Sequence, residues 1–168
     1  MLGWMRRKLF ILFRRLSFGS EPICVSKLLQ DPQGVLIVLP RREEEFGKVT
    51  RWVRRWMGQR EGVLVVSSFF CANRSTICCD ELIPSDDDFR KLKGVLDRRS
   101  IDMLIDLSDR PQDRSRMISL LSGARLRVAS FSDPPFFNCQ IRTEGTETAQ
   151  SIGLLKVLEE CFARGSLP

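Results

Sequence analysis

Residues 35–39 read Val-Leu-Ile-Val-Leu and follow directly on Pro32-Gln33-Gly34. An apolar run of this length, without alternating polar residues, is typical of a central strand in a parallel sheet, where helices cover both faces. A helical pattern follows over residues 44–57, and a second apolar run, Val63–Ser67, comes after Gly62. A strand, a helix and a second strand predict a right-handed crossover, so this stretch indicates an α/β fold.

The same alternation continues to the end of the chain. We expect further strands at residues 73–79, 101–107 and 125–129, an extended segment at 136–141, and helices at 87–96, 111–121 and 146–162. Ser85 or Asp86 is placed to cap the first of these later helices, and Gly123 to end the second. The elements predict a single Rossmann-like domain over residues 21–168, with a mostly parallel sheet and helices on both faces.

The helix expected at residues 44–57 divides its side chains between two faces. Its inner face carries Phe46, Val49, Val53 and Trp56. Its solvated side carries Arg51, Arg54 and Arg55. Three glutamates, Glu43, Glu44 and Glu45, open the helix, where acidic side chains interact favourably with the positive end of the helix dipole. They are therefore either helix-start residues or candidates for catalysis.

Charge is concentrated at the amino end of the chain. The sequence carries 27 basic and 21 acidic side chains, for a net charge of +6. Residues 1–20 hold Arg6, Arg7, Lys8, Arg14 and Arg15 and no acid, so residues 21–168 are nearly neutral. A nucleic-acid-binding domain carries its Lys and Arg on one face of the fold. We therefore expect no nucleic-acid partner.

Residues 1–20 are predicted to form a separate unit, a basic amphipathic helix. Charged residues interrupt it too often for it to span a bilayer. Its cations and aromatic groups suit a helix that lies in a membrane interface over anionic headgroups, or one that packs on its own domain or on a larger protein complex. The residues expected to make this contact are Trp4, Arg6, Arg7, Lys8, Phe10, Phe13, Arg14 and Arg15.

The start of the chain lacks the apolar core and cleavage site of a signal peptide. We therefore expect a cytoplasmic protein, peripheral at the inner face of the membrane, with reduced thiols. The chain has six cysteines but no histidine and no Cys-x-x-Cys spacing. Buried core cysteines are favoured over a structural zinc site, so we expect no metal and no cofactor.

Ligands of doubly wound sheets bind beyond the carboxyl ends of the strands. No Gly-x-Gly-x-x-Gly follows the first strand, no phosphate-binding P-loop occurs, and a Ser-His-Asp triad is impossible without histidine. The remaining candidates at this edge are Arg41, Arg42, Ser67, Asp106 and Ser108. Asp102 and Asp106 share one face of the fourth strand. Asp106 is the one nearer the ligand edge, where it is either a cleft residue or a turn or cap residue.

Two motifs then carry a resemblance to a known family. Asp102-Met103-Leu104-Ile105-Asp106-Leu107 is followed, after a helix, by Leu120-Leu121-Ser122-Gly123-Ala124-Arg125-Leu126-Arg127. With Phe136-Phe137-Asn138 and the helix after it, they resemble in order and spacing the N-terminal domain of heptosyltransferases, glycosyltransferase family 9. The resemblance covers roughly residues 33–160. It implies an acceptor-binding domain, whereas a second Rossmann-like domain of that family binds the nucleotide-sugar donor.

The resemblance also implies a catalytic base after the first strand, the Asp of a Gly-Asp pair. An ungapped alignment places Glu45 at that Asp and Glu44 at the Gly. Alternatively, Gly47-Lys48 aligns with the pair and a cation replaces the base. Either way the signature is broken, and one domain supplies half of the cleft that glycosyl transfer needs.

These observations lead us to expect a degenerate glycosyltransferase-like domain that is not catalytic alone. It would serve as a membrane-surface or complex-assembly subunit, attached through residues 1–20. The alternative is the acceptor-binding half of a glycosyltransferase, which works with a separate donor-binding chain and uses Glu45 as its base.

Overall fold

The computed structural model describes most of the body of the chain. The described residues are Ile11, Val25, Leu28, 32–40, Val49, 51–55, 62–67, 76–78, 82–84, 86–143 and 147–165. Six strands form one sheet in the order β3-β2-β1-β4-β5-β6. They are β1 (Val35–Val38), β2 (Val63–Ser67), β3 (Thr76–Cys78), β4 (Met103–Asp106), β5 (Leu126–Ala129) and β6 (Cys139–Gln140).

Every neighbouring pair of these strands is parallel. The strand order is that of a Rossmann-like sheet, with β1 and β4 side by side at the centre. At the level of Val38 in β1, the register places Val66 of β2 on one side and Asp106 of β4 on the other. The strand order reverses between β1 and β4, so the edge beyond Val38 and Asp106 is where such a sheet binds ligands.

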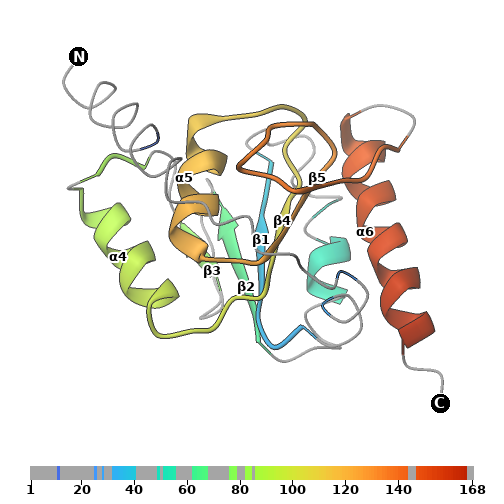
Figure 1. Ribbon diagram of the computed structural model, residues 1–168, viewed down its shortest axis with the longest axis horizontal. Coiled ribbons are helices and arrows are strands. Elements are labelled where there is room, and N and C mark those ends of the chain that lie inside the picture. Colours follow the sequence, from blue (N-terminus) through green and yellow to red (C-terminus); the bar gives the residue numbers. More distant parts are fainter. Residues whose placement is uncertain are drawn as a thin grey trace.

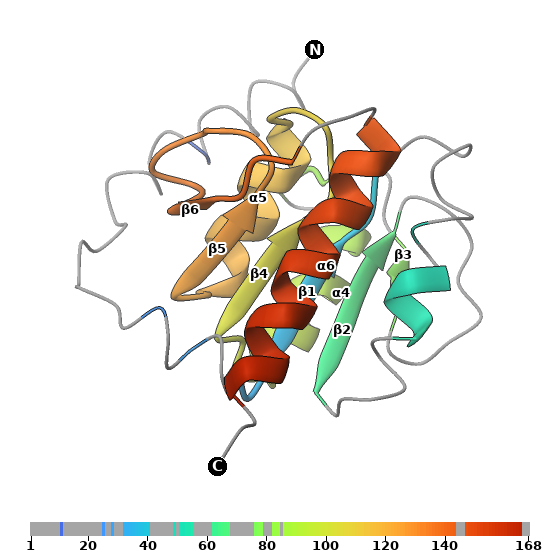
Figure 2. The same cartoon turned by 90° about the vertical axis from the view of Figure 1, so that its right-hand side faces the viewer.

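Helices cover both faces of the sheet, because strand side chains alternate between two apolar cores. On one face, α4 (Asp87–Leu96) and α5 (Asp113–Ser122) pack on Leu36, Leu64 and Leu104. On the other, α6 (Glu147–Gly165) and the helical segment 51–55 pack on Ile37, Val65 and Ile105. Figure 1 shows α4 and α5 on one side of the strands and α6 on the other, and Figure 2 looks onto the α6 face.

A loop rather than a helix connects β5 to β6. Phe131, Phe136 and Phe137 of this loop are buried in the α4–α5 core, with the rings of Phe131 and Phe137 edge to face at 5.1 Å. Asn138 then ties the loop to β5: its Oδ1 accepts from the Arg127 N–H at 2.8 Å, and its Nδ2 donates to the Arg125 carbonyl at 2.8 Å. Phenylalanine rings thus fill the volume that a crossover helix would occupy.

The α/β fold predicted from the sequence is confirmed. Helix α4 has the predicted bounds, with Asp86 at its N-cap. Gly123 ends α5 in the left-handed conformation, at φ 63°. Strand β3, at Thr76–Cys78, lies within the expected range 73–79, whose other residues are outside the described ones, and α5 begins at Asp113 rather than at Pro111.

The predicted front helix lies outside the described residues except for Ile11. Ile11 is helical, 8% exposed, and belongs to the core between the sheet and the helices α4 and α5. At this residue the front segment packs on the body of its own chain. The boundary between residues 20 and 21 stays a prediction. Within the part of the chain that the structure describes, no helix is long and apolar enough to cross a membrane.

Candidate functional site

Three of the predicted cleft residues lie at the carboxyl edge of the sheet, but they do not form one open surface. Asp106 and Ser67 are both 0% exposed, and Ser108 is also buried. Ser67 continues the alternation of Val63 and Val65 and so belongs to the α6 face, whereas Asp106 continues that of Leu104 on the α5 face. The sheet therefore separates Ser67 from Asp106.

The carboxyl group of Asp106 turns back onto its own chain and towards the first turn of α5. Its Oδ1 accepts a hydrogen bond from the Ser108 N–H at 2.9 Å. Burial raises the pKa of Asp106, and this is opposed by the hydroxyl groups of Ser115 and Ser108, the Ser108 N–H and the charge of Arg114. Among the described residues, neither Asp106 Oδ2 nor the Ser115 hydroxyl completes a hydrogen bond of ordinary geometry. The group is thus an internal carboxyl that favours its neutral form.

Side chains of the chain itself occupy the backbone acceptors just beyond β4. The hydroxyl of Ser151, in α6, donates to the Leu107 carbonyl at 2.9 Å. The hydroxyl of Ser130, after β5, donates to the Ser108 carbonyl at 3.3 Å. The Leu107 N–H is bonded to the Val38 carbonyl at 2.9 Å. At β4, internal hydrogen bonds therefore engage the backbone groups directly beyond the strand, at the edge where a Rossmann-like sheet binds its ligand.

The other site predictions lie outside the described residues. These are Arg41, Arg42 and Glu45 after β1, and the front-segment residues Trp4, Arg6, Arg7, Lys8, Phe10, Phe13, Arg14 and Arg15. Their roles stay predictions. Asp102, which the strand pattern placed on the same face as Asp106, lies before β4 at the opposite edge of the sheet. There its Oδ2 accepts from the Gln33 N–H at 2.9 Å, so its role is to join the starts of β1 and β4.

Several residues that shape this edge were missed from the sequence. Arg114 and Ser115 reach Asp106 from the first turn of α5, and Ser151 reaches Leu107 from α6. A signal existed for the first two: a helix that starts directly beyond β4 places its first turn over the end of that strand. Ser151 lies 44 positions from its partner, and no local pattern connects them.

An ion pair holds the loop between β5 and β6 against α5. Arg116 Nε lies 2.8 Å from Asp133 Oδ2, and Arg116 Nη2 lies 3.2 Å from Asp133 Oδ1. The guanidinium also lies over the Phe136 ring, 5.6 Å from its centroid. Asp133, together with Asp113, raises the pKa of Arg116. This planar two-point contact positions the loop and is structural in character.

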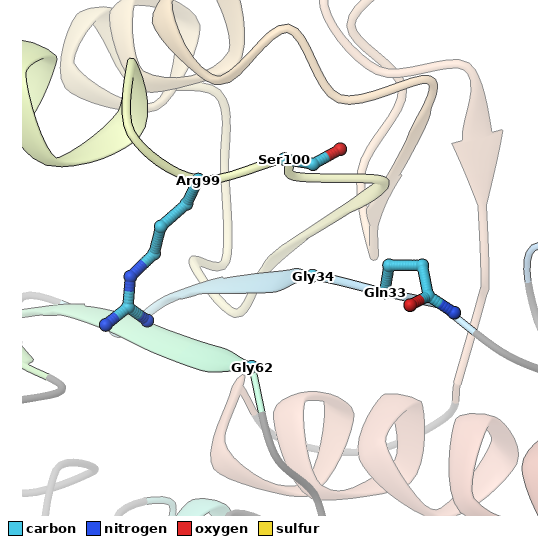
Figure 3. Close-up of a pocket in the computed structure, with 5 residues that line it drawn as sticks. All are labelled: Gln33, Gly34, Gly62, Arg99 and Ser100. Atoms are coloured by element: carbon cyan, nitrogen blue, oxygen red, sulfur yellow. The ribbon is translucent and has the colours of Figure 1, made fainter.

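A hollow of about 380 Å³ lies at the opposite, amino edge of the sheet, lined by Gln33, Gly34, Gly62, Arg99 and Ser100 (Figure 3). A Cβ at Gly34 would lie 2.0 Å from the Ser100 carbonyl oxygen, and one at Gly62, where φ is +80°, would lie 2.6 Å from the Gln33 carbonyl oxygen. Both glycines are needed because the chain segments pack so closely there. The hollow therefore follows from strand packing, and it lies away from the edge where this fold binds ligands.

Metal-binding chemistry is not assembled within the described residues, which contain no group of three or more potential ligand side chains. Cys139 and Cys161 are free thiols, both half-buried. Burial, followed by the proximity of Cys161, raises the pKa of the Cys139 thiol. A raised thiol pKa disfavours the nucleophilic thiolate, so Cys139 is suited to packing rather than to reaction.

Comparison with protein-family models, with curated proteins and with solved structures found no match for this chain. Its function must therefore be inferred from its own residues.

Proposed function

We propose that this chain is a degenerate glycosyltransferase-like domain of the heptosyltransferase acceptor type, which does not catalyse alone. It acts as a membrane-surface or complex-assembly subunit, attached through residues 1–20. The resemblance of its sequence motifs, in order and spacing, suggests the ancestry. The strand order is compatible with it, since a Rossmann-like sheet is what that ancestry requires.

The observation that carries the non-catalytic part is the burial of the end of β4. Asp106, the candidate carboxyl at this edge, is fully buried and bonded to Ser108. Ser151 and Ser130 occupy the carbonyl groups beyond it. A catalytic group must come within hydrogen-bond reach of the atom whose proton it takes. Asp106 has no such access, and the first-strand signature of the family is broken at Glu44 and Glu45.

Attachment through residues 1–20 is supported by charge. This segment holds nearly all of the net charge of the chain. Clusters of Lys and Arg next to large apolar side chains attract anionic membrane surfaces. Ile11, the described residue of this segment, is buried in the α4–α5 core, so an attachment at this point would hold the body of the chain.

Turnover tests the catalytic status. The purified chain, alone and with candidate donor-binding chains, is incubated with nucleotide-heptose donors and lipid-linked sugar acceptors. We expect no transfer by the chain alone. Transfer that depends on a second chain and is lost in Glu45→Gln would overturn the proposal and establish the acceptor-half alternative.

Attachment is tested by replacing Arg6, Arg7, Lys8, Arg14 and Arg15 with Gln in the full chain, because deleting the segment would also remove the buried Ile11. We expect the wild-type chain to float with anionic vesicles, or to co-purify with a stable complex, and the variant to lose that association. If the variant behaves like the wild type in both assays, residues 1–20 are not the attachment.

A further inference from the structure

The helical segment 51–55 presents cations that have no acidic partner among the described residues. Arg51, Arg54 and Arg55 are exposed on the side away from the buried Val49 and Val53. The ion pairs found among the described residues lie elsewhere, on α4 and around Arg116. Like charges four residues apart, such as Arg51 and Arg55, destabilise a helix. Packing does not require this charge, since the buried side of the segment is apolar.

Trp52 connects these arginines to α6. Its half-buried ring packs against the core that α6 covers. Arg55 Cζ lies 5.8 Å and Lys156 Nζ 5.6 Å from the centroid of the Trp52 ring, which is within cation–π range. Arg55 and Lys156 therefore lie beside the Trp52 ring, and Arg51 and Arg54 are exposed on the same helical segment. Trp52 and these four cations are here called the Trp52 surface. In Figure 2, segment 51–55 and α6 lie on the same face of the sheet.

On the opposite face of the sheet, the cations of α4 are paired with acidic residues. On α4, Arg90 pairs with Asp87, Lys91 with Asp88 and Lys93 with Asp97. Each of these cations is neutralised by a carboxylate one turn away in the same helix. On α6, Glu159 and Glu160 lie one turn from Lys156, but no ion pair among the described residues joins either of them to the Trp52 surface.

Three anionic partners would complement such a surface: a bilayer, a nucleic acid or an acidic protein segment. Ile11, the described residue of the front segment, lies in the core on the α4–α5 face, which is opposite the Trp52 surface, and this favours a bilayer on that other face. Single-stranded nucleic acid binds by stacking its bases on free aromatic rings, whereas the Trp52 ring is already engaged by two cations. Guanidinium groups match carboxylates with two parallel hydrogen bonds, as they do phosphates, so the choice of an acidic protein segment rests on the face of the surface and on the engaged Trp52 ring.

We infer that the Trp52 surface is a docking site for an acidic segment of a partner protein, held by ion pairs from its three arginines and Lys156. This inference rests on the proposed function and deepens its complex-assembly part. Residues 1–20 would attach the chain on one side, while the Trp52 surface binds the partner on the other.

The probe is a fluorescein-labelled peptide rich in Glu, and its binding to the full chain is followed by fluorescence anisotropy. We expect the triple variant Arg51→Gln/Arg54→Gln/Arg55→Gln to weaken binding about tenfold or more, since it removes most of the complementary charge. The matched control is Arg90→Gln/Lys91→Gln/Lys93→Gln, which makes the same change in net charge on α4. We expect it to weaken binding by less than about twofold, because screening limits the effect of distant charges. Equal effects of the two variants overturn the inference.

A chemical cross-link to Lys156 would show directly where the peptide binds. A carbodiimide activates a probe carboxyl group, and attack by the Lys156 amine forms an amide while the carboxyl oxygen leaves in the urea by-product. Mass spectrometry should find this cross-link at Lys156 and not at Lys91, which is paired with Asp88. Cross-links confined to residues 1–20 would overturn the inference. Binding of anionic vesicles or of single-stranded RNA that the triple variant abolishes, with the peptide unbound, would overturn it too.

The variant with all five front-segment cations replaced by Gln separates the two hypotheses. If it keeps peptide binding but loses attachment, both stand. If it loses both peptide binding and attachment while the triple variant keeps the peptide, the inference fails and the proposed function stands. If the five-cation variant keeps its attachment and the triple variant no longer binds the peptide, the proposed function fails and the Trp52 surface remains a docking site.

Discussion

Asp106 Oδ1 accepts a hydrogen bond from the backbone N–H of Ser108 at 2.9 Å, with both residues buried at the end of β4. An Asp side chain bonded to the N–H two residues ahead forms an Asx turn, which ends a strand without help from solvent. The Asp106 carboxyl group, which the sequence marks as a candidate for chemistry, therefore has a structural role at the end of β4. Burying this ionisable group lowers the free energy of unfolding, by an amount that depends on pH.

Replacing Asp106 with Asn keeps the Oδ1 acceptor and removes the ionisable group. Burial raises the pKa of Asp106 in the folded protein, so between the unfolded and folded pKa values the folded state binds more protons than the unfolded state. The stability contributed by the protonated carboxyl is fully present below the unfolded pKa and is lost as pH rises through the folded pKa. We expect the free energy of unfolding of Asp106→Asn, relative to wild type, to increase from acidic to neutral pH.

Urea unfolding at a series of pH values measures this difference. Asp97→Asn is the control, since Asp97 is an exposed carboxylate that pairs with Lys93 on α4, and it should not reproduce the trend. A difference between wild type and Asp106→Asn that is independent of pH would contradict a buried carboxyl that titrates.

The ion pair between Arg116 and Asp133 should stabilise the protein by more than an ordinary surface ion pair does. Its side chains are 28% and 12% exposed, and it makes two parallel hydrogen bonds. A double-mutant cycle with Arg116→Met and Asp133→Ala should give a coupling energy of about 1–2 kcal/mol. The same cycle on Arg90 and Asp87, whose side chains are 70% and 77% exposed, should give at most about 0.5 kcal/mol. Coupling energies that do not differ would show that the loop is held by its phenylalanine residues alone.

The sequence predicted the fold well where local patterns decide it. Helix α4 was bounded correctly because its apolar spacing, its first-turn acids Asp87 and Asp88, and its N-cap all agree. The central strand at residues 35–38 was recognisable because burial on both faces leaves a purely apolar run. Strand β6 has two residues and was seen as an extended segment, since so short a strand has no periodicity to detect.

The candidate site was predicted less completely, because distant residues decide it. The alternation of β4 placed Asp106 on one face of the strand, but whether that face is open depends on the first turn of α5. The closure at Leu107 depends on Ser151, which arrives from α6. Contacts of this kind are fixed by tertiary packing, and the spacing of residue types along the chain does not encode them.

Ser151→Ala tests the closure at β4. The substitution removes the hydroxyl that donates to the buried Leu107 carbonyl, and it should lower the free energy of unfolding by about 1 kcal/mol. Ser130→Ala removes the longer bond to the Ser108 carbonyl from a half-buried hydroxyl, and it should cost less. Chemical denaturation of both variants measures the difference. A larger loss in Ser130→Ala would indicate that the loop after β5, rather than α6, closes this edge.

Substitution by alanine should destabilise the protein at Gly34 and stabilise it at Gly94. A Cβ at Gly34 would lie 2.0 Å from the Ser100 carbonyl oxygen, and the Gly34 carbonyl itself accepts from the Asp102 and Met103 N–H groups. Because backbone would have to move on both sides of the contact, Gly34→Ala should cost about 3 kcal/mol or more, or prevent folding. At Gly94, inside α4, the nearest atom to an added Cβ is the tip of the Arg98 side chain at 4.0 Å.

Gly94→Ala should therefore stabilise the protein by about 0.5–1 kcal/mol, through better helix propensity and a less flexible unfolded chain. Thermal unfolding compares the two variants with wild type, and the amount of soluble protein reports on Gly34→Ala if it fails to fold. A Gly34→Ala variant as stable as the wild type would show that the starts of β1 and β4 lie further apart than 2.0 Å implies. A destabilised Gly94→Ala variant would show instead that the surface of α4 at this position is covered.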